Sequence, residues 1–194
     1  MEVHRVNADV DSMITGALQE NPGVARSTPW PQYAKTGDGV EYRIRPIRTD
    51  DRERDRAFIA GLSTRSRYGR MMGLMREPAA ELLDHLMRVD YRREMALVAV
   101  VGAGADETIV AAARYGGNPA YCEFAVVVAD EWQGRGIGTH FAEFLFAYAK
   151  ANGVRRMYAI LPADNERMLK LAGALRMSVR RSSSESVVEA WRTL

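Results

Sequence analysis

The spacing of apolar and polar positions changes from irregular to periodic at about residue 40 of the chain. Apolar and polar residues alternate from Val40 to Ile47, which indicates a half-buried strand. The next stretch repeats apolar residues at helical spacing, so we expect three amphipathic helices there. The first is predicted to have Thr49 as its cap and to turn Phe58, Ile59 and Leu62 inward. The second is predicted to run from about Ser66 to Met75, and the third to begin at Pro78.

The rest of the chain places short β-rich runs between amphipathic stretches, which is typical of a mixed sheet flanked by helices. Strands are predicted at 94–101, 108–115, 121–129 and 156–161, helices from a glycine turn to Asn152-Gly153 and at 165–176, and two closing strands around Ser182–Ser184. We therefore predict a single α/β (α+β) domain over residues 40–194. Proline and glycine interrupt residues 1–39, so we expect an N-terminal arm or linker there, with a short helix from Val10 to Leu18.

Gly134, Gly136 and Gly138 connect the strand predicted at 121–129 to the next helix. Glycine lets the backbone approach a ligand closely, and the first N–H groups of a helix have no partner within the helix. An anion such as a phosphate is the natural ligand of such a turn. A tight connection that binds nothing would need fewer glycines, because each one costs backbone entropy.

Two well-known phosphate loops do not fit this turn. A Walker A loop needs Gly-Lys followed by Ser or Thr, but no lysine occurs between Lys35 and Lys150. A dinucleotide fingerprint would need a glycine at the position of Thr139. The remaining pattern, Gln133-x-x-Gly136-x-Gly138 between an apolar strand and a long helix, resembles the GNAT N-acetyltransferase superfamily from about residue 41 to the C-terminus. This resemblance implies a mostly antiparallel central sheet and acetyl-CoA as co-substrate.

The resemblance also implies roles for individual residues. Glu123 lies in an otherwise apolar strand, where an isolated glutamate would simply reach solvent or pair with an arginine. In a GNAT enzyme it would be the general base for an amine. A base is needed because a lysine ammonium has a pKa of about 10.4 and must lose a proton near neutral pH. Burial would raise the pKa of the glutamate and make it a suitable acceptor for that proton. Asn165 is a candidate N-cap and is also implied to contact the pantetheine arm of coenzyme A. No general acid is assigned, since Met168 and Leu169 stand where a tyrosine is common in the family.

The donor site implied by the resemblance is built largely from backbone. The exposed backbone of the strand would pair with the pantetheine arm like an added strand, and the N–H groups of the turn would hold the pyrophosphate, with charge added by Arg135. These implied acetyl-CoA-binding residues are Val126, Val127, Val128, Gln133, Gly134, Arg135, Gly136, Ile137, Gly138 and Thr139.

Composition limits the other classes of function. The chain has 194 residues, 47% hydrophobic and 27% charged, and its net charge of +2 comes without a concentrated basic stripe, so no nucleic-acid partner is expected. No run is apolar for the ~20 residues that span a bilayer, and the start lacks a signal-peptide pattern, so we expect no membrane partner and a cytoplasmic location. Cys122 is the single cysteine, which excludes an internal disulfide, and the three histidines have no metal-binding spacing.

The front half of the chain bears on the acceptor of the acetyl group. The runs Tyr42-Arg-Ile-Arg-Pro-Ile-Arg and Ser63-Thr-Arg-Ser-Arg-Tyr-Gly-Arg look like the catalytic domain of bacterial protein lysine acetyltransferases, which implies an acyl-CoA synthetase as the protein partner. A small amine such as a polyamine is the alternative, although a polycation would favour carboxylates and the region from Arg65 to Arg76 is basic. A non-catalytic acyl-CoA sensor is a third reading.

Overall fold

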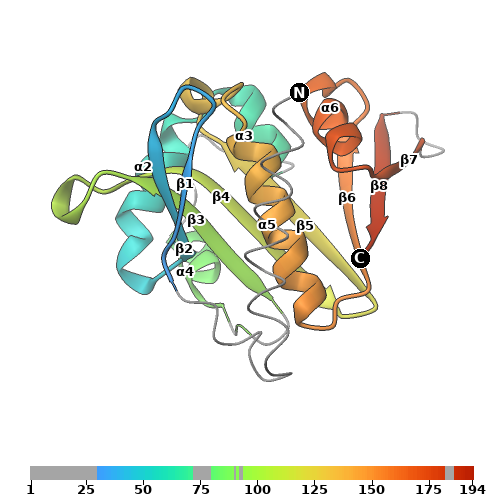
Figure 1. Ribbon diagram of the computed structural model, residues 1–194, viewed down its shortest axis with the longest axis horizontal. Coiled ribbons are helices and arrows are strands. Elements are labelled where there is room, and N and C mark those ends of the chain that lie inside the picture. Colours follow the sequence, from blue (N-terminus) through green and yellow to red (C-terminus); the bar gives the residue numbers. More distant parts are fainter. Residues whose placement is uncertain (1–29, 72–79, 90, 92–93, 182–185) are drawn as a thin grey trace.

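The computed structural model describes residues 30–71, 80–89, 91, 94–181 and 186–194. Within these ranges eight strands form one sheet in the order β1-β2-β3-β4-β5-β6-β8-β7, and every neighbouring pair is antiparallel except β5 and β6 (Figure 1). The predicted mixed, mostly antiparallel sheet flanked by helices is confirmed. The strands are β1 Gln32–Lys35, β2 Glu41–Pro46, β3 Met95–Val101, β4 Thr108–Asn118, β5 Tyr121–Val128, β6 Arg156–Pro162, β7 Ser178–Arg181 and β8 Val187–Thr193.

Helices cover both faces of the sheet and bury one apolar cluster on each. Helices α5 and α6 pack on one face, where Phe141 and Leu145 of α5 lie fully buried against the strands. Helices α2 and α4 pack on the opposite face through Phe58, Ile59 and Leu83. The helical segments are η2 Thr49–Asp51, α2 Arg52–Gly61, α3 Thr64–Met71, α4 Ala80–Met87, η3 Gly104–Asp106, η4 Asp130–Trp132, α5 Ile137–Ala151 and α6 Glu166–Ala174.

Most of the predicted elements appear within two or three residues of their predicted limits. The expected cap at Thr49 is wrong: Thr49 begins a short 3-10 turn, and Asp51 is the N-cap of α2. Helix α3 begins at Thr64, before the predicted Ser66, and its predicted end at Met75 lies outside the described residues. The predicted start of α4 at Pro78 and the predicted helix from Val10 to Leu18 also lie outside them.

Strand β1 belongs to the sheet although it falls inside the predicted N-terminal arm. Its residues pair antiparallel with β2, from Gln32 with Ile44 to Lys35 with Glu41. Just before it, the Trp30 ring packs edge-on against Phe144 of α5, with ring centroids 5.7 Å apart. Residues 32–35 are therefore part of the folded domain, and backbone pairing placed them there without a strong apolar pattern.

Helix α6 ends in a Schellman motif that contains an arginine. Arg176 has φ +54°, and the N–H of Met177 bonds to the carbonyl of Ala172 at 2.9 Å. Glycine is the usual residue at this left-handed position. The sequence Leu175-Arg176-Met177 therefore keeps the turn geometry at the cost of a strained backbone.

A buried ion pair joins β2 to the start of the first helix. Arg45 is 4% exposed and binds Asp51, which is fully buried, through two hydrogen bonds of 2.6 and 2.7 Å. Arg45 also contacts the Glu107 carboxylate. Burial raises the pKa of Asp51, but hydrogen bonds from Arg45 and the Arg48 N–H outweigh it and hold the pKa below its usual value.

Substitution of Arg45 by methionine should destabilise the protein by about 3–5 kcal/mol, because the buried Asp51 carboxylate loses both guanidinium hydrogen bonds and keeps only the more distant Arg54, at 3.6 Å. Denaturant unfolding measures this as a lower midpoint. Arg56→Met, which removes an exposed pair with Glu53, is the matched control and should not shift the midpoint. Equal midpoints for wild type and Arg45→Met would contradict the role of this pair.

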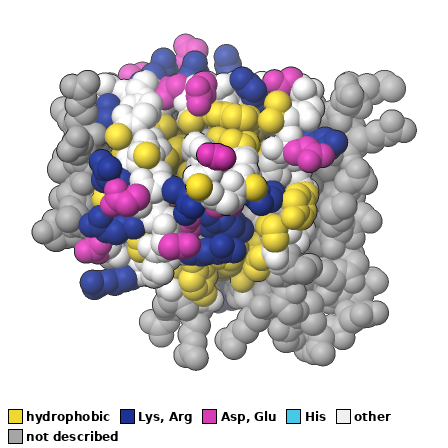
Figure 2. Space-filling view, turned by 90° about the vertical axis from the view of Figure 1, so that its left-hand side faces the viewer, with side chains coloured by type: hydrophobic (Ala, Val, Ile, Leu, Met, Phe, Trp, Pro, Cys, Tyr) yellow, Lys and Arg dark blue, Asp and Glu magenta, His cyan; other side chains and the backbone are white. Residues whose placement is uncertain are grey.

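Acidic and basic side chains are interspersed on the face that carries α2 and β1 (Figure 2). Helix α2 and strand β2 contribute ion pairs of Arg52 with Asp84 and of Arg43 with Glu107, each at 2.8 Å. This face has no strong field of a single sign. Among the described helices, none is both long and apolar enough to cross a membrane.

Candidate active site

Strands β5 and β6 separate soon after they meet, and this separation opens the site. Their parallel pairing covers two rungs, Cys122 with Met157 and Glu123 with Tyr158. From Phe124 to Val128, β5 is paired only with β4 within the described part of the chain. On that edge Val126–Val128 has no strand partner, as a strand-like ligand would require, although the Val128 carbonyl accepts a hydrogen bond of 2.9 Å from Gln133 Nε2.

The glycine turn closes one end of this opening. Gly134 and Gly136 have φ values of +78° and +86°, a conformation that glycine adopts without strain. Gly136 is the N-cap of α5, so the unpaired N–H groups of the helix's first turn follow directly after it. A Cβ atom at Gly136 would meet no atom within 4 Å, so the turn borders open space at this position. The local geometry is that of an anion site at a helix N-terminus.

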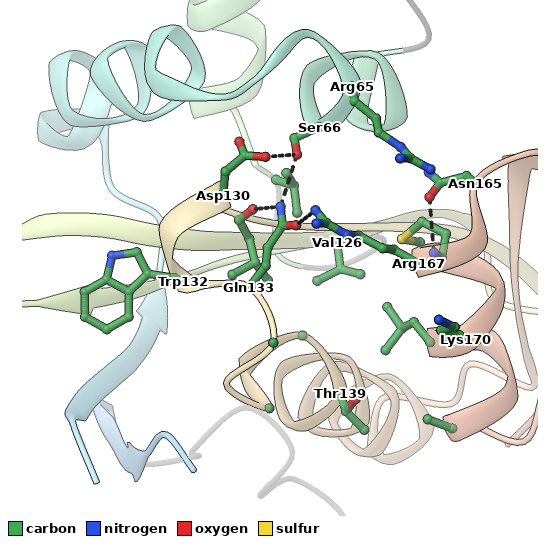
Figure 3. A pocket seen from close by; sticks show the side chains of 18 residues that line it. Arg65, Ser66, Val126, Asp130, Trp132, Gln133, Thr139, Asn165, Arg167 and Lys170 are labelled. Atoms are coloured by element: carbon green, nitrogen blue, oxygen red, sulfur yellow. Dashed lines mark hydrogen bonds between the residues drawn. The ribbon is translucent and has the colours of Figure 1, made fainter. Parts of the chain in front are cut away.

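A pocket of about 640 Å³ lies between β5, the glycine turn and α6 (Figure 3). It contains most of the residues that the sequence assigned to acetyl-CoA: Val126, Val127, Val128, Gln133, Gly134, Gly136, Gly138, Thr139 and Asn165. The structure thus brings the strand, the turn and the helix cap together around one cavity. The volume is in the range typical of small-molecule sites.

Two residues assigned to the same site are absent from the pocket lining. Ile137 is 1% exposed and packs in the core. Arg135 turns away from the cavity: its Nη1 binds Asp38 at 3.1 Å, and its guanidinium lies 4.9 Å from the Trp132 ring centre. The hairpin between β1 and β2 competes for this arginine, so the expectation that its side chain adds charge to the pocket does not fit the structure. The backbone N–H groups of both residues remain part of the turn.

A directional chain of hydrogen bonds links α6 to α3 through the turn. Arg167 donates to Oε1 of Gln133, whose Nε2 donates to Ser66 Oγ at 3.1 Å. Ser66 in turn donates to Asp130 at 2.8 Å, and so does Ser63. Burial raises the pKa of Asp130, but the hydrogen bonds from the two serines and the charge of Arg167 outweigh it, so the pKa lies below its usual value.

Glu123 lies on an open part of the sheet rather than in a buried environment. Its side chain is exposed, on the face that α2 and α4 cover further along, so the expected burial of this glutamate is wrong. Tyr158 on β6 donates a hydrogen bond of 3.4 Å to Glu123 Oε2. Burial, together with the charge of Glu123, raises the pKa of Tyr158, which therefore stays protonated and able to donate at neutral pH. Tyr121 stacks on Tyr158 with ring centres 4.1 Å apart and holds it in place.

The remaining candidates have structural roles that the contacts explain. Asn165 caps α6, because its Oδ1 accepts a hydrogen bond of 3.2 Å from the Met168 N–H, and it also lines the pocket. Cys122 is fully buried on the face opposite to Glu123, and burial raises the pKa of its thiol. Among the described residues, no group of three or more His, Cys, Asp or Glu side chains could hold a metal ion.

Sequence reasoning missed the residues that reach the pocket from α3 and α6. On α6 they recur at helical spacing, so the periodicity of one helix face could have found them once the cap at Asn165 was known. Tyr158 had no such signal, because its contact with Glu123 depends on the register of two strands. The additional lining residues are Arg65, Ser66, Asp130, Trp132, Arg167, Met168, Lys170, Leu171 and Ala174.

Charge favours an anionic ligand in this pocket. The lining includes the cations Arg65, Arg167 and Lys170 against one carboxylate, Asp130. That carboxylate is already bonded to Ser63 and Ser66. Coenzyme A carries a pyrophosphate and a 3′-phosphate, so the charge, the glycine turn and the open strand edge all fit it. Arginine in particular matches the geometry of phosphate oxygens.

Known proteins resemble this chain in sequence and in fold. The model of the acetyltransferase (GNAT) family matches residues 89–175. Acetyltransferase PA5475 of Pseudomonas aeruginosa is 38% identical over 151 residues, which cover 77% of this chain and 81% of that protein. Acetyltransferase Pat of Mycolicibacterium smegmatis is 34% identical over 151 residues, covering 76% of this chain and 44% of that protein. The GNAT domain of S. lividans PAT has a TM-score of 0.78 at 27% identity, covering 85% of this chain and 97% of that one.

The chain therefore belongs to the GNAT acetyltransferase family. Enzymes of this family transfer an acetyl group from acetyl-CoA to an amine, and the chain is an N-acetyltransferase in this sense. The resemblance that the glycine turn and its flanking elements indicated is confirmed.

Proposed function

We propose that the protein acetylates a lysine side chain of another protein, with Glu123 as the general base. The observation that carries this proposal is the position of Glu123. It is an exposed carboxylate at the last rung before β5 and β6 separate, three residues before Val126, where β5 begins to line the pocket. A lysine that arrives on this open face would meet the carboxylate and the thioester together.

The open setting of Glu123 favours a large acceptor over a small one. Small-molecule sites usually enclose most of their ligand, whereas the carboxylate here is exposed in the described structure. A docked protein would itself cover the carboxylate and remove water from it. An acyl-CoA synthetase is the substrate class that the sequence resemblance to bacterial protein lysine acetyltransferases implies.

The chemistry assigned to these residues is a direct transfer. Glu123 accepts a proton from the lysine ammonium, and Tyr158 orients the carboxylate through its hydrogen bond. The freed amine attacks the thioester carbonyl carbon, a C–N bond forms, and the C–S bond breaks. An N–H of the free edge of β5 would polarise the carbonyl. Once the C–N bond has formed, the nitrogen releases its second surplus proton to water, and the departing thiolate takes up a proton from water in its place.

An acetyl-CoA consumption assay with matched acceptors tests this proposal. Purified acyl-CoA synthetases are compared with polyamines, amino acids and aminoglycosides, and mass spectrometry locates the modified lysine. We expect one lysine of a synthetase to be acetylated with a kcat/KM well above that of any small amine. Faster turnover of a small amine would overturn the protein acceptor, and acetyl-CoA binding without turnover of any acceptor would indicate a sensor.

A further inference from the structure

The glycine turn offers N–H groups to a phosphate but not the charge of its own arginine. Arg135 is held outside the pocket by Asp38 and Trp132. The Gly37 N–H also bonds to the Arg135 carbonyl at 3.0 Å, which fixes the turn against the β1–β2 hairpin. Any side-chain cation that meets a bound pyrophosphate would therefore come from another element. Among the described residues, the cations that line the pocket are Arg65, Arg167 and Lys170.

Arg167 is the one of these three that is tied to the turn itself. Figure 3 shows its side chain reaching from α6 across the pocket to Gln133. The amide of Gln133 is fixed in one orientation, because its Nε2 donates both to the Val128 carbonyl at 2.9 Å and to Ser66 Oγ at 3.1 Å. Its Oε1 is thereby presented to Arg167. The neighbours of Gln133 thus determine where the guanidinium lies.

The contact with Gln133 leaves most of the guanidinium available. Gln133 engages Nη1, and a guanidinium carries five N–H donors in a planar fork. The other edge can bind two oxygens of a phosphate at once. Gln133 also directly precedes Gly134, the first glycine of the turn. The guanidinium therefore lies next to the start of the glycine turn.

We infer that Arg167 binds the pyrophosphate of coenzyme A, and that it supplies the positive charge that Arg135 does not bring to the glycine turn. This inference rests on the proposed use of acetyl-CoA by this pocket. Gln133 is then a positioning residue that holds the arginine in place before the ligand arrives. Lys170 stands one turn further along α6, and neither it nor Arg65 has a recorded contact with the turn in the described residues.

Ligands with and without the 3′-phosphate separate the two phosphate positions. Isothermal titration of wild type, Arg167→Met and Arg135→Met is carried out with CoA and with 3′-dephospho-CoA, which keeps the pyrophosphate. We expect Arg167→Met to raise Kd by about 10- to 100-fold for both ligands, because a charge-assisted hydrogen bond is lost. Arg135→Met should change Kd by less than about threefold, since its side chain lies outside the pocket. Arg167→Lys should recover part of the affinity through its charge.

Several outcomes overturn the inference. An unchanged Kd for Arg167→Met, or a loss as large in Arg135→Met, would remove Arg167 as the pyrophosphate ligand. A loss confined to CoA would assign Arg167 to the 3′-phosphate instead. If wild type binds neither ligand, the proposed function fails together with the inference. Arg167 is exposed on α6, so the ligand-free melting temperature should match wild type and shows that each variant is folded.

Discussion

Glu123→Gln is expected to lower kcat for amine acetylation by about 100- to 10,000-fold, the usual range for loss of a general base. The amide keeps the size of the side chain and can still accept a hydrogen bond from Tyr158, but it cannot take up the ammonium proton. Steady-state kinetics at saturating acetyl-CoA measure the change. The Kd for acetyl-CoA should stay within about twofold, because the carboxylate does not line the donor pocket.

Glu41→Gln is the matched control for this experiment. It removes an exposed carboxylate of β2 whose partner is Lys35 and which does not line the pocket, so kcat should not change. A Glu123→Gln enzyme with the wild-type kcat would remove Glu123 as the base. The same variant in the acceptor assay also separates enzymatic acetylation from direct chemical acetylation by acetyl-CoA.

Gly136→Asp is expected to weaken acetyl-CoA binding by at least about 100-fold, because it places a carboxylate where the anion is held. At 100 times the wild-type Kd, acetyl-CoA should stabilise the wild type by about 2.7 kcal/mol, a melting shift of about 5–10 °C for a chain of this size. The variant should lose nearly all of this shift. Differential scanning fluorimetry with and without ligand measures it.

Gly136→Asn separates the effect of charge from that of the backbone. Asn and Asp both tolerate the left-handed conformation that Gly136 adopts, with φ +86°, and neither meets an atom near Cβ. The two variants should therefore have similar ligand-free melting temperatures. We expect Gly136→Asn to retain a clear part of the acetyl-CoA shift. Equal losses in both would show that charge at the turn is irrelevant, and a full shift in Gly136→Asp would place the anion elsewhere.

Local patterns were sufficient for most elements and for the glycine turn between β5 and α5. Alternation predicted β5, the glycines predicted the turn, and Asn165 was recognised as a helix cap, because each signal lies within a few residues of the feature it predicts. The same patterns misjudged the environment of Glu123. A strand alternates between two faces, but only the packed helices decide how much of a face is covered.

The residues that complete the site come from distant parts of the chain. Tyr158 contacts Glu123 across 35 residues and Arg167 contacts Gln133 across 34, and both contacts depend on where β6 and α6 settle against β5. The diversion of Arg135 toward Asp38 spans 97 residues. No short-range pattern can report such pairings.

The sequence by itself thus determined the strand, glycine turn and helix that define a GNAT donor site, because period and turn chemistry are properties of adjacent residues. The tertiary structure decided which side chains surround that backbone. In the folded chain Glu123 is exposed and bonded to Tyr158. Arg135 pairs with Asp38 outside the pocket, whereas Arg167 lines it. The physical reason is that side-chain charges are distributed by packing and by competition between partners, and these are settled only when the whole sheet has formed.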